Sequence, residues 1–160
     1  MFSITLICMG KLKEKFYISA AGEYKKRLGA FCSFQLLELP EYKLPEVPNQ
    51  TQIAQGLSRE AELIRTKIPK GSFFCVLAPE GKMLSSEELA GKLSDIKKSG
   101  RSSVCFLIGS SFGVDAGLKK QADLLLSMSR MTFPHHLARV MALEQLYRAE
   151  SIQAGTKYHK

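Results

Sequence analysis

Short apolar runs alternate with longer segments of helical periodicity along the whole chain. The apolar runs predict strands, and they span Ile4–Met9, Phe34–Leu39, Ser72–Ala78, Ser103–Ile108 and Leu124–Met128. The periodic segments predict helices over residues 11–28, 51–67, 85–98, a short stretch that ends near 122, and 134–152. Because strands and helices alternate, the predicted fold class is α/β, with a mainly parallel sheet flanked by helices.

Local signals place several of the predicted boundaries. Ser85 and Glu88 have the spacing of a capping box, which predicts a helix start. Pro134 suits the first position of the last helix, and Thr132 is placed to cap its first turn. Residues 79–82, Pro-Glu-Gly-Lys, predict a turn directly after the third strand.

Size and composition agree with one globular unit. Of the 160 residues, 45% are hydrophobic and 24% charged, so residues 1–160 are expected to form a single domain with a packed core. Cys8, Cys32, Cys75 and Cys105 form no CxxC pair and are interpreted as reduced core residues. No apolar run approaches the ~20 residues that a bilayer requires, so no membrane partner is expected and the predicted location is cytoplasmic.

The charge balance points to a partner. Lys and Arg number 23 against 15 Asp and Glu, a formal net charge of +8. Such an excess favours a polyanionic partner, although a basic surface without any partner has the same composition. The last six residues, 155–160, contain two lysines, a histidine and Tyr158, a combination suited to unpaired RNA, while the alternative interpretation is a frayed terminus.

Three predicted strands are followed by loops whose composition suits ligand binding. Loops of small or turn-forming residues follow Leu77, Ile108 and Met128. Sheet edges of this kind bind nucleotide-like ligands, although ordinary turns have the same composition. The segment Gly109–Gly113, GSSFG, lacks the first Gly-x-Gly of a dinucleotide fingerprint and comes late in the chain, which argues against a Rossmann redox role.

Two other kinds of chemistry are disfavoured. His135 and His136 are adjacent, and no third ligand follows at metal-binding spacing, so no metal site is expected. The chain also contains no GxSxG nucleophile motif, which argues against a hydrolase.

The last predicted helix is apolar on nearly every side, which indicates burial on two faces. One face can meet the sheet and the other requires a partner, so a two-fold homodimer packed through this helix is predicted. Glu144 and Arg148 stand at i,i+4 and are expected to pair. Arg139 has no such local partner, and its side chain either extends to solvent from the first turn or contacts a phosphate near the ligand loop.

These residues together resemble one family, the small SPOUT-class methyltransferases that modify N3 of a pseudouridine in bacterial large-subunit (23S) ribosomal RNA. The resemblance covers the whole chain in order, spacing and length. It is carried by Gly10-Lys11, Glu23-Tyr24, Arg27-Leu28, Gly81-Lys82, Ile108-Gly109 with Gly113, Leu126-Ser127, Thr132 to His135, Arg139-Val140, Glu144-Gln145, Tyr147 to Ala149 and Tyr158 to Lys160.

The resemblance implies a SPOUT fold with a deep trefoil knot roughly within residues 72–160, and a homodimer whose partner subunit helps to form the RNA site. It also implies S-adenosyl-L-methionine as cofactor and no metal. Carried over residue by residue, the family's cofactor contacts fall on Leu77, Gly109, Met128, Ser129, Arg130, Met131, Thr132 and Phe133. The sequence departs from the family pattern at Ala78, where an acidic residue is common, and at Ser110, which replaces a glycine.

The implied activity is S-adenosylmethionine-dependent methylation of 23S rRNA in the ribosome, at an imide nitrogen that must lose its proton. Catalysis of this kind comes from alignment of the nitrogen with the methyl group and from cations near the developing anion. The candidates for substrate positioning or proton removal are His135, Arg139, Tyr158 and His159, with no base chosen among them. A non-catalytic RNA-binding or ribosome-assembly module on the same fold is the alternative; methylation of tRNA is a second, for which the chain lacks room for a separate tRNA-binding domain.

Overall fold

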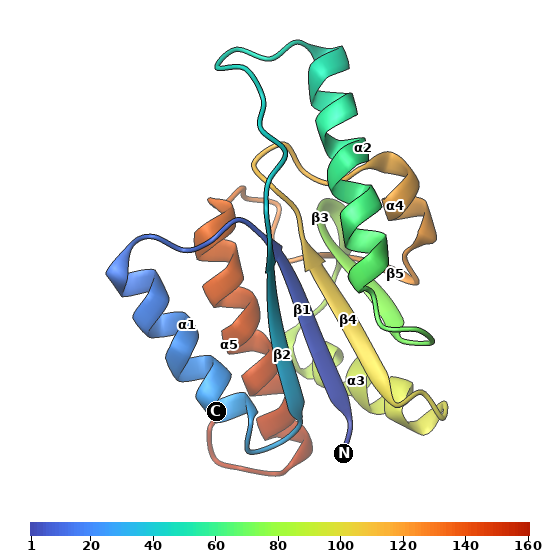
Figure 1. Ribbon diagram of the computed structural model, residues 1–160. Coiled ribbons are helices and arrows are strands. Elements are labelled where there is room, and N and C mark those ends of the chain that lie inside the picture. The colour runs from blue at the N-terminus through green and yellow to red at the C-terminus, as the bar shows by residue number, and fades with distance from the viewer.

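The computed structural model describes residues 1–160 as strands and helices that alternate around one sheet (Figure 1). The elements are β1 (Ser3–Met9), α1 (Lys15–Leu28), β2 (Ser33–Leu39), α2 (Gln50–Lys67), β3 (Phe73–Met83), α3 (Ser86–Lys98), β4 (Ser103–Ile108), α4 (Ala116–Gln121), β5 (Leu124–Ser127) and α5 (His135–Gln153). The strand order is β2-β1-β4-β3-β5 and every neighbouring pair is parallel, which confirms the predicted α/β class. None of the helices combines the length and apolar character that a membrane span requires.

Helices cover both faces of the sheet. Along β1, Ile4 and Leu6 pack with α1, α3 and α5 in one core cluster, while Ile7 and Met9 pack with α2 and α4 in a second. The split follows from strand geometry, since successive side chains point to opposite faces. A sheet covered on both faces has strands that are apolar throughout rather than alternating, and the central strands β1 and β4 have this pattern.

Several boundaries confirm the predictions and others differ. The capping box between Ser85 and Glu88 is present. Helix α1 begins later than predicted, at Lys15, because Gly10 has a φ of +78° and a loop follows it. Helix α5 begins at His135 with Pro134 at the N-cap and no side-chain cap, so the cap predicted for Thr132 is wrong: its side chain lies upstream of the capping position.

The turn predicted at residues 79–82 is part of β3. This strand pairs with β5 as far as Leu77, leaves the ladder, and pairs again from Lys82. Gly81 permits the close approach, since a Cβ atom there would lie 2.6 Å from the carbonyl carbon of Leu125. The irregular stretch leaves main-chain groups outside the ladder where the strands end.

All four cysteines are free and buried, which confirms their interpretation as core residues. Burial raises the pKa of Cys8, Cys75 and Cys105 to about 12 and that of Cys32 to about 11. They are neutral thiols that pack as small hydrophobic groups, and none is activated as a nucleophile.

Candidate active site

A cavity of about 520 Å³ opens where β4 and β5 end and where β3 leaves its ladder with β5. Its volume lies within the range of roughly 300–1,000 Å³ that is usual for small-molecule sites, and its position is the one at which parallel α/β sheets bind ligands. Three loops and the start of α5 form its walls. The lining residues are Leu77–Pro79, Ile108–Ser111, Gly113, Val114, Lys119, Leu126–Ser129, Met131–His135 and Ala138.

Two of these loops are shaped by contacts within themselves. In the loop after β4, the Gly113 amide donates to the Ser110 carbonyl at 2.9 Å, and Gly113 has a φ of +94°, a conformation that favours glycine. In the loop after β5, the Ser127 hydroxyl donates to the Ser129 carbonyl at 3.0 Å, and the Met131 amide donates to the Ser129 hydroxyl at 3.0 Å. The protein's own hydrogen bonds therefore fix the shape of these two cavity walls.

The structure brings most of the predicted cofactor residues around this cavity. Seven of the eight line it: Leu77, Gly109, Met128, Ser129, Met131, Thr132 and Phe133. Arg130 does not line the cavity; its side chain is exposed in the same loop. Met131 is 74% exposed, so it stands at the rim of the cavity.

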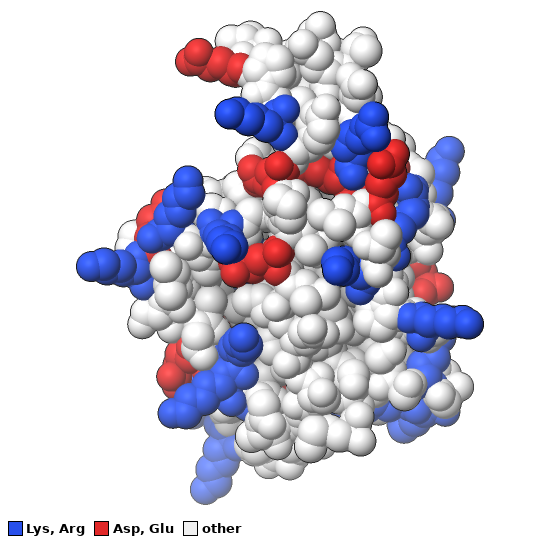
Figure 2. Space-filling view, viewed as in Figure 1, with Lys and Arg blue, Asp and Glu red and all other residues white.

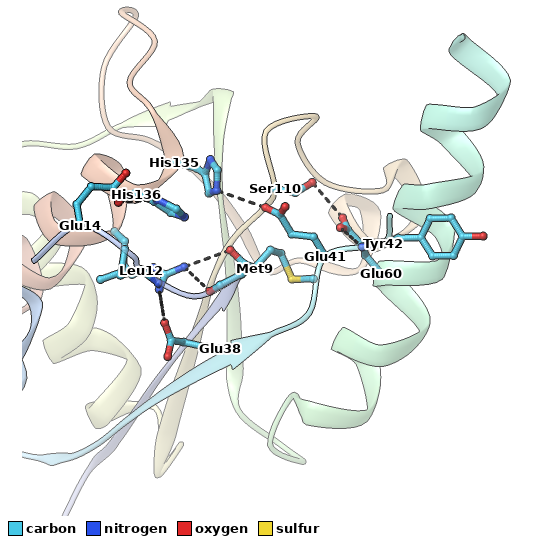
Figure 3. Close-up of polar contacts among 12 residues, drawn as sticks. Met9, Leu12, Glu14, Glu38, Glu41, Tyr42, Glu60, Ser110, His135 and His136 are labelled. Carbon is cyan, nitrogen blue, oxygen red and sulfur yellow. Dashed lines mark hydrogen bonds and ion pairs between the residues drawn. The ribbon is translucent and has the colours of Figure 1, made fainter. Parts of the chain in front are cut away.

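The two adjacent histidines at the start of α5 contact carboxylates from separate segments (Figure 3). His135 Nε2 lies 3.3 Å from Glu41 Oε1, and His136 Nδ1 lies 3.9 Å from Glu14 Oε2. Burial, His136 and Arg139 hold the pKa of His135 below its usual range, although Glu41 acts in the opposite direction. His135 is therefore neutral at neutral pH. Nowhere do three or more His, Cys, Asp or Glu side chains gather as a metal ion requires.

Neither predicted placement of the Arg139 side chain is correct, because it is 1% exposed. Its Nη1 donates to Glu38 Oε2 at 2.7 Å, and its Nη2 donates to the carbonyls of Gly10 at 2.9 Å and Met9 at 3.2 Å. Acceptors at the ends of β1 and β2 draw the guanidinium inward, away from solvent and from any phosphate. Arg139 thus holds two strand ends to α5.

The last residues are docked on the protein rather than frayed. The ring of Tyr158 packs edge-on against that of Tyr147, with centroids 4.6 Å apart. The Arg148 guanidinium lies 4.8 Å from the centre of the Tyr158 ring. His159 Nδ1 lies 3.1 Å from Arg148 Nη1, and its Nε2 lies 2.7 Å from Glu87 Oε1. These contacts join the tail to α5 and α3.

The tail and His135 are not brought together within one subunit. Arg148, on which the tail packs, lies roughly 20 Å along α5 from His135, at ~1.5 Å per residue. The predicted pair between Glu144 and Arg148 is confirmed, with 2.5 Å between Arg148 Nη2 and Glu144 Oε1. The four catalytic candidates therefore occupy three places: the cavity wall, the buried end of the sheet, and the far half of α5.

Two carboxylates that the sequence analysis did not single out lie beside this site. Glu41 contacts His135, and Glu60 of α2 is 7% exposed and hydrogen-bonded to Ser110 in the cavity wall. A signal for Glu60 exists in the sequence, because it falls among Gly56, Ala61 and Ile64 on the buried face of α2. For Glu41, within an exposed loop, there is none.

Positive charge is spread over the molecule. In Figure 2, Lys and Arg side chains lie along the left flank over α1 and along the right flank. The lower part of the surface between them is uncharged, and Asp and Glu side chains lie above it. A polyanion could therefore be held from both flanks while uncharged surface lies between.

Comparison with known proteins agrees with this architecture. A family model described as Predicted SPOUT methyltransferase matches residues 2–159. Proteins named Ribosomal RNA large subunit methyltransferase H from Streptococcus suis and Moorella thermoacetica are 45% and 44% identical to this chain, over 157 and 160 residues. The alignments cover 98% and 100% of this chain and 99% and 100% of those proteins.

Solved structures support the fold at much lower identity. A probable methyltransferase from Bordetella pertussis superposes with a TM-score of 0.54 at 13% identity, covering 92% of this chain and 95% of that one. The tRNA (m1G37) methyltransferase from Aquifex aeolicus superposes with a TM-score of 0.53 at 14% identity, covering 98% and 73%.

The parallel sheet, its cavity at the strand ends and the family model together define a methyltransferase of the SPOUT class. Sequence identity near 45%, over essentially the whole length of both chains, then identifies the family within this class. The chain belongs to the ribosomal RNA large subunit methyltransferase H family.

Proposed function

We propose that this protein transfers a methyl group from S-adenosyl-L-methionine to N3 of the pseudouridine at position 1915 of 23S rRNA in the large ribosomal subunit. The observation that carries the proposal is the full-length match to the family, in a chain whose preformed cavity lies at the ends of the parallel strands. The net charge of +8 and its spread over both flanks suit an RNA partner.

The residues around the cavity fit the cofactor. Beyond the pair Leu77 and Ile108 the β3–β4 ladder ends, and β3 leaves its ladder with β5 until Lys82, so main-chain donors and acceptors are available to a flat heterocycle. We assign cofactor contacts to Leu77, Gly109 and residues 128–133. When bound there, S-adenosylmethionine supplies an electrophilic methyl group on its sulfonium.

His135 is the side chain to which we assign removal of the substrate proton. It lines the cavity and is neutral at neutral pH. If Nε2 carries the ring proton toward Glu41, then Nδ1 is unprotonated and can accept a proton from the substrate. Arg139 acts at one remove, because it holds the ends of β1 and β2 against the first turns of α5.

The pH dependence of turnover tests this role for His135. Protonated His135 cannot accept a proton, so activity is lost as the pH falls through its lowered pKa, and the acid limb of kcat should lie below ~6.5, the usual histidine value. Glu41→Gln removes the neighbour that raises the His135 pKa and should move the limb to still lower pH. Glu46→Gln, an exposed carboxylate of the same loop, should leave it in place. A limb at or above pH ~6.5 in the unaltered protein would contradict the assignment.

Three architectural features belong to the same proposal. We infer that residues 1–160 act as a single domain, that the chain is knotted within residues 72–160, and that two copies form a two-fold dimer through α5. Family membership supports all three. The dimer is also supported by the partly exposed Val140 and Met141 on α5, which border a largely apolar groove of about 580 Å³.

Deleting residues 158–160 should end methylation while leaving cofactor binding intact. Tyr158 and His159 lie far from the cavity of their own subunit, so in a two-fold dimer they are available to the RNA site of the partner. Binding of S-adenosylmethionine is measured by calorimetry, and methylation by primer extension at the modified base. Removing Lys160 alone, which keeps both rings in place, is the matched control. Full activity after the longer deletion would show that the tail has no role with RNA.

Transfer of a tritiated methyl group to ribosomes that lack the modification tests the proposed function itself. Incorporation at the pseudouridine, confirmed by mass spectrometry of the rRNA, is the expected result. Tight binding to ribosomes without incorporation would instead identify a non-catalytic RNA-binding or assembly module.

A further inference from the structure

One buried carboxylate, that of Glu60 on α2, joins the cavity-lining loop after β4 to the segment after β2 (Figure 3). Its Oε1 accepts a hydrogen bond from the Ser110 hydroxyl and its Oε2 accepts one from the Tyr42 amide, each at 3.0 Å. Ser110 belongs to the loop after β4. Tyr42 directly follows Glu41, whose carboxylate contacts His135 at the start of α5. A single side chain thus touches the loop assigned to the cofactor and the segment that meets the assigned base.

Stability alone does not account for a carboxylate at this position. Burial raises the pKa of Glu60, while the hydrogen bonds from Tyr42 and Ser110 lower it. A buried carboxylate is costly unless it is hydrogen-bonded, so this one depends on its two donors. Glu60 stands beside Ala61 and Ile64 on the otherwise apolar buried face of α2. The carboxylate differs from leucine in its two fixed hydrogen bonds.

Packing holds only the ends of the Ser110 loop, at Gly109 and Val114, so its middle needs such an anchor. Ser110 and Ser111 line the cavity described above and also a second cavity of about 500 Å³, formed with residues 41–46 and α2. With open space on both sides, the position of this loop depends on directed contacts. The bond from Ser110 to Glu60 connects it to the helix layer.

We propose that Glu60 is a positioning residue of the methyl-transfer site, which sets the cofactor loop through Ser110 and the orientation of His135 through Tyr42 and Glu41. The proposal rests on the function assigned above. The proposal predicts two separable effects: an affinity arm, measured as the dissociation constant of the cofactor, and a turnover arm, measured as kcat.

Each arm has its own variant. Ser110→Ala removes one hydrogen bond and should weaken S-adenosylmethionine binding about 2- to 10-fold with little change in kcat. Glu41→Ala should lower kcat and leave the dissociation constant of the cofactor unchanged. Glu60→Leu should show both effects, with a loss in kcat of up to roughly 100-fold, the scale of a ~1 Å misplacement. Glu60→Gln should recover most of both, since an amide can accept from Tyr42 and donate to Ser110.

Calorimetry with S-adenosylmethionine and steady-state methylation of ribosomes measure the two arms, and thermal unfolding measures stability. Glu62→Leu, an exposed carboxylate on the same helix, is the control and should match the unaltered protein.

Unchanged affinity and turnover in Glu60→Leu would overturn the proposal, and so would a loss that Glu60→Gln fails to restore. If Glu60→Leu does not fold, Ser110→Ala and Glu41→Ala decide, and the absence of either separate effect overturns it. An unaltered protein that binds the cofactor and methylates nothing would refute the proposed function, while the affinity arm would still be readable.

Discussion

Replacing Gly109 with alanine should weaken S-adenosylmethionine binding about 10- to 100-fold, and Gly109→Arg should abolish it. A Cβ atom at Gly109 would lie 2.3 Å from the Gly113 carbonyl oxygen and 2.6 Å from Val114 Cγ2. Because the first contact is with backbone, the loop after β4 must move. Overpacking of this kind costs about 1–3 kcal/mol, and 1.4 kcal/mol corresponds to roughly tenfold in affinity. That loop forms part of the cavity wall, so the cost falls on cofactor binding.

Gly91→Ala provides the matched control. Gly91 lies in α3, and a Cβ atom there would meet nothing within 4 Å. The substitution should leave affinity unchanged and stabilise the helix by up to ~1 kcal/mol. Titration calorimetry on the folded variants gives the comparison. Cofactor binding by Gly109→Arg at the strength of the unaltered protein would place the cofactor somewhere other than this cavity.

Replacing Arg139 with methionine should destabilise the protein by about 3 kcal/mol. The change leaves the carbonyls of Met9 and Gly10 without their donor and removes the partner of Glu38, which lies 2.7 Å away. Breaking a buried ion pair costs roughly 3–5 kcal/mol, and the lower end applies because Glu38 is partly exposed. For a chain of this size the melting temperature should fall by roughly 6–12 °C.

Arg59→Met is the control for this measurement. Arg59 pairs with Glu62 on the surface of α2 at 3.6 Å, with both side chains more than half exposed, and an exposed pair contributes about 0–1 kcal/mol. Thermal unfolding should therefore separate the two variants clearly. Equal melting temperatures for Arg139→Met and the unaltered protein would mean that the Arg139 contacts do not hold α5 to the sheet. Activity of Arg139→Met measured below its melting temperature then reports how far the position of His135 depends on that attachment.

Local patterns in the sequence predicted most of the fold. Apolar runs and helical periodicity located every strand and helix, since these signals depend on residues within a few positions of one another. One of the boundaries that failed depends on a contact between distant segments. The turn predicted after Ala78 continues as strand because β5, some fifty residues later, pairs with Lys82 and Met83.

The candidate site divides in the same way. Resemblance to the family identified the loops around the cavity, and seven of the eight assigned cofactor residues line it. Pro134 and His135, at the start of α5, line the same cavity.

By itself, then, the amino-acid sequence determined the α/β class, the succession of elements, the family and the loops that surround the cavity, because each is encoded in short-range pattern or in motifs of fixed spacing. Only the tertiary structure decided which distant segments supply partners to the buried and partly buried polar residues. Arg139 meets Glu38 across 101 positions of the chain, Ser110 meets Glu60 across 50, and His135 meets Glu41 from a different layer of the fold. A buried charge requires a partner, but which one it finds depends on how the sheet and helices bring distant segments together.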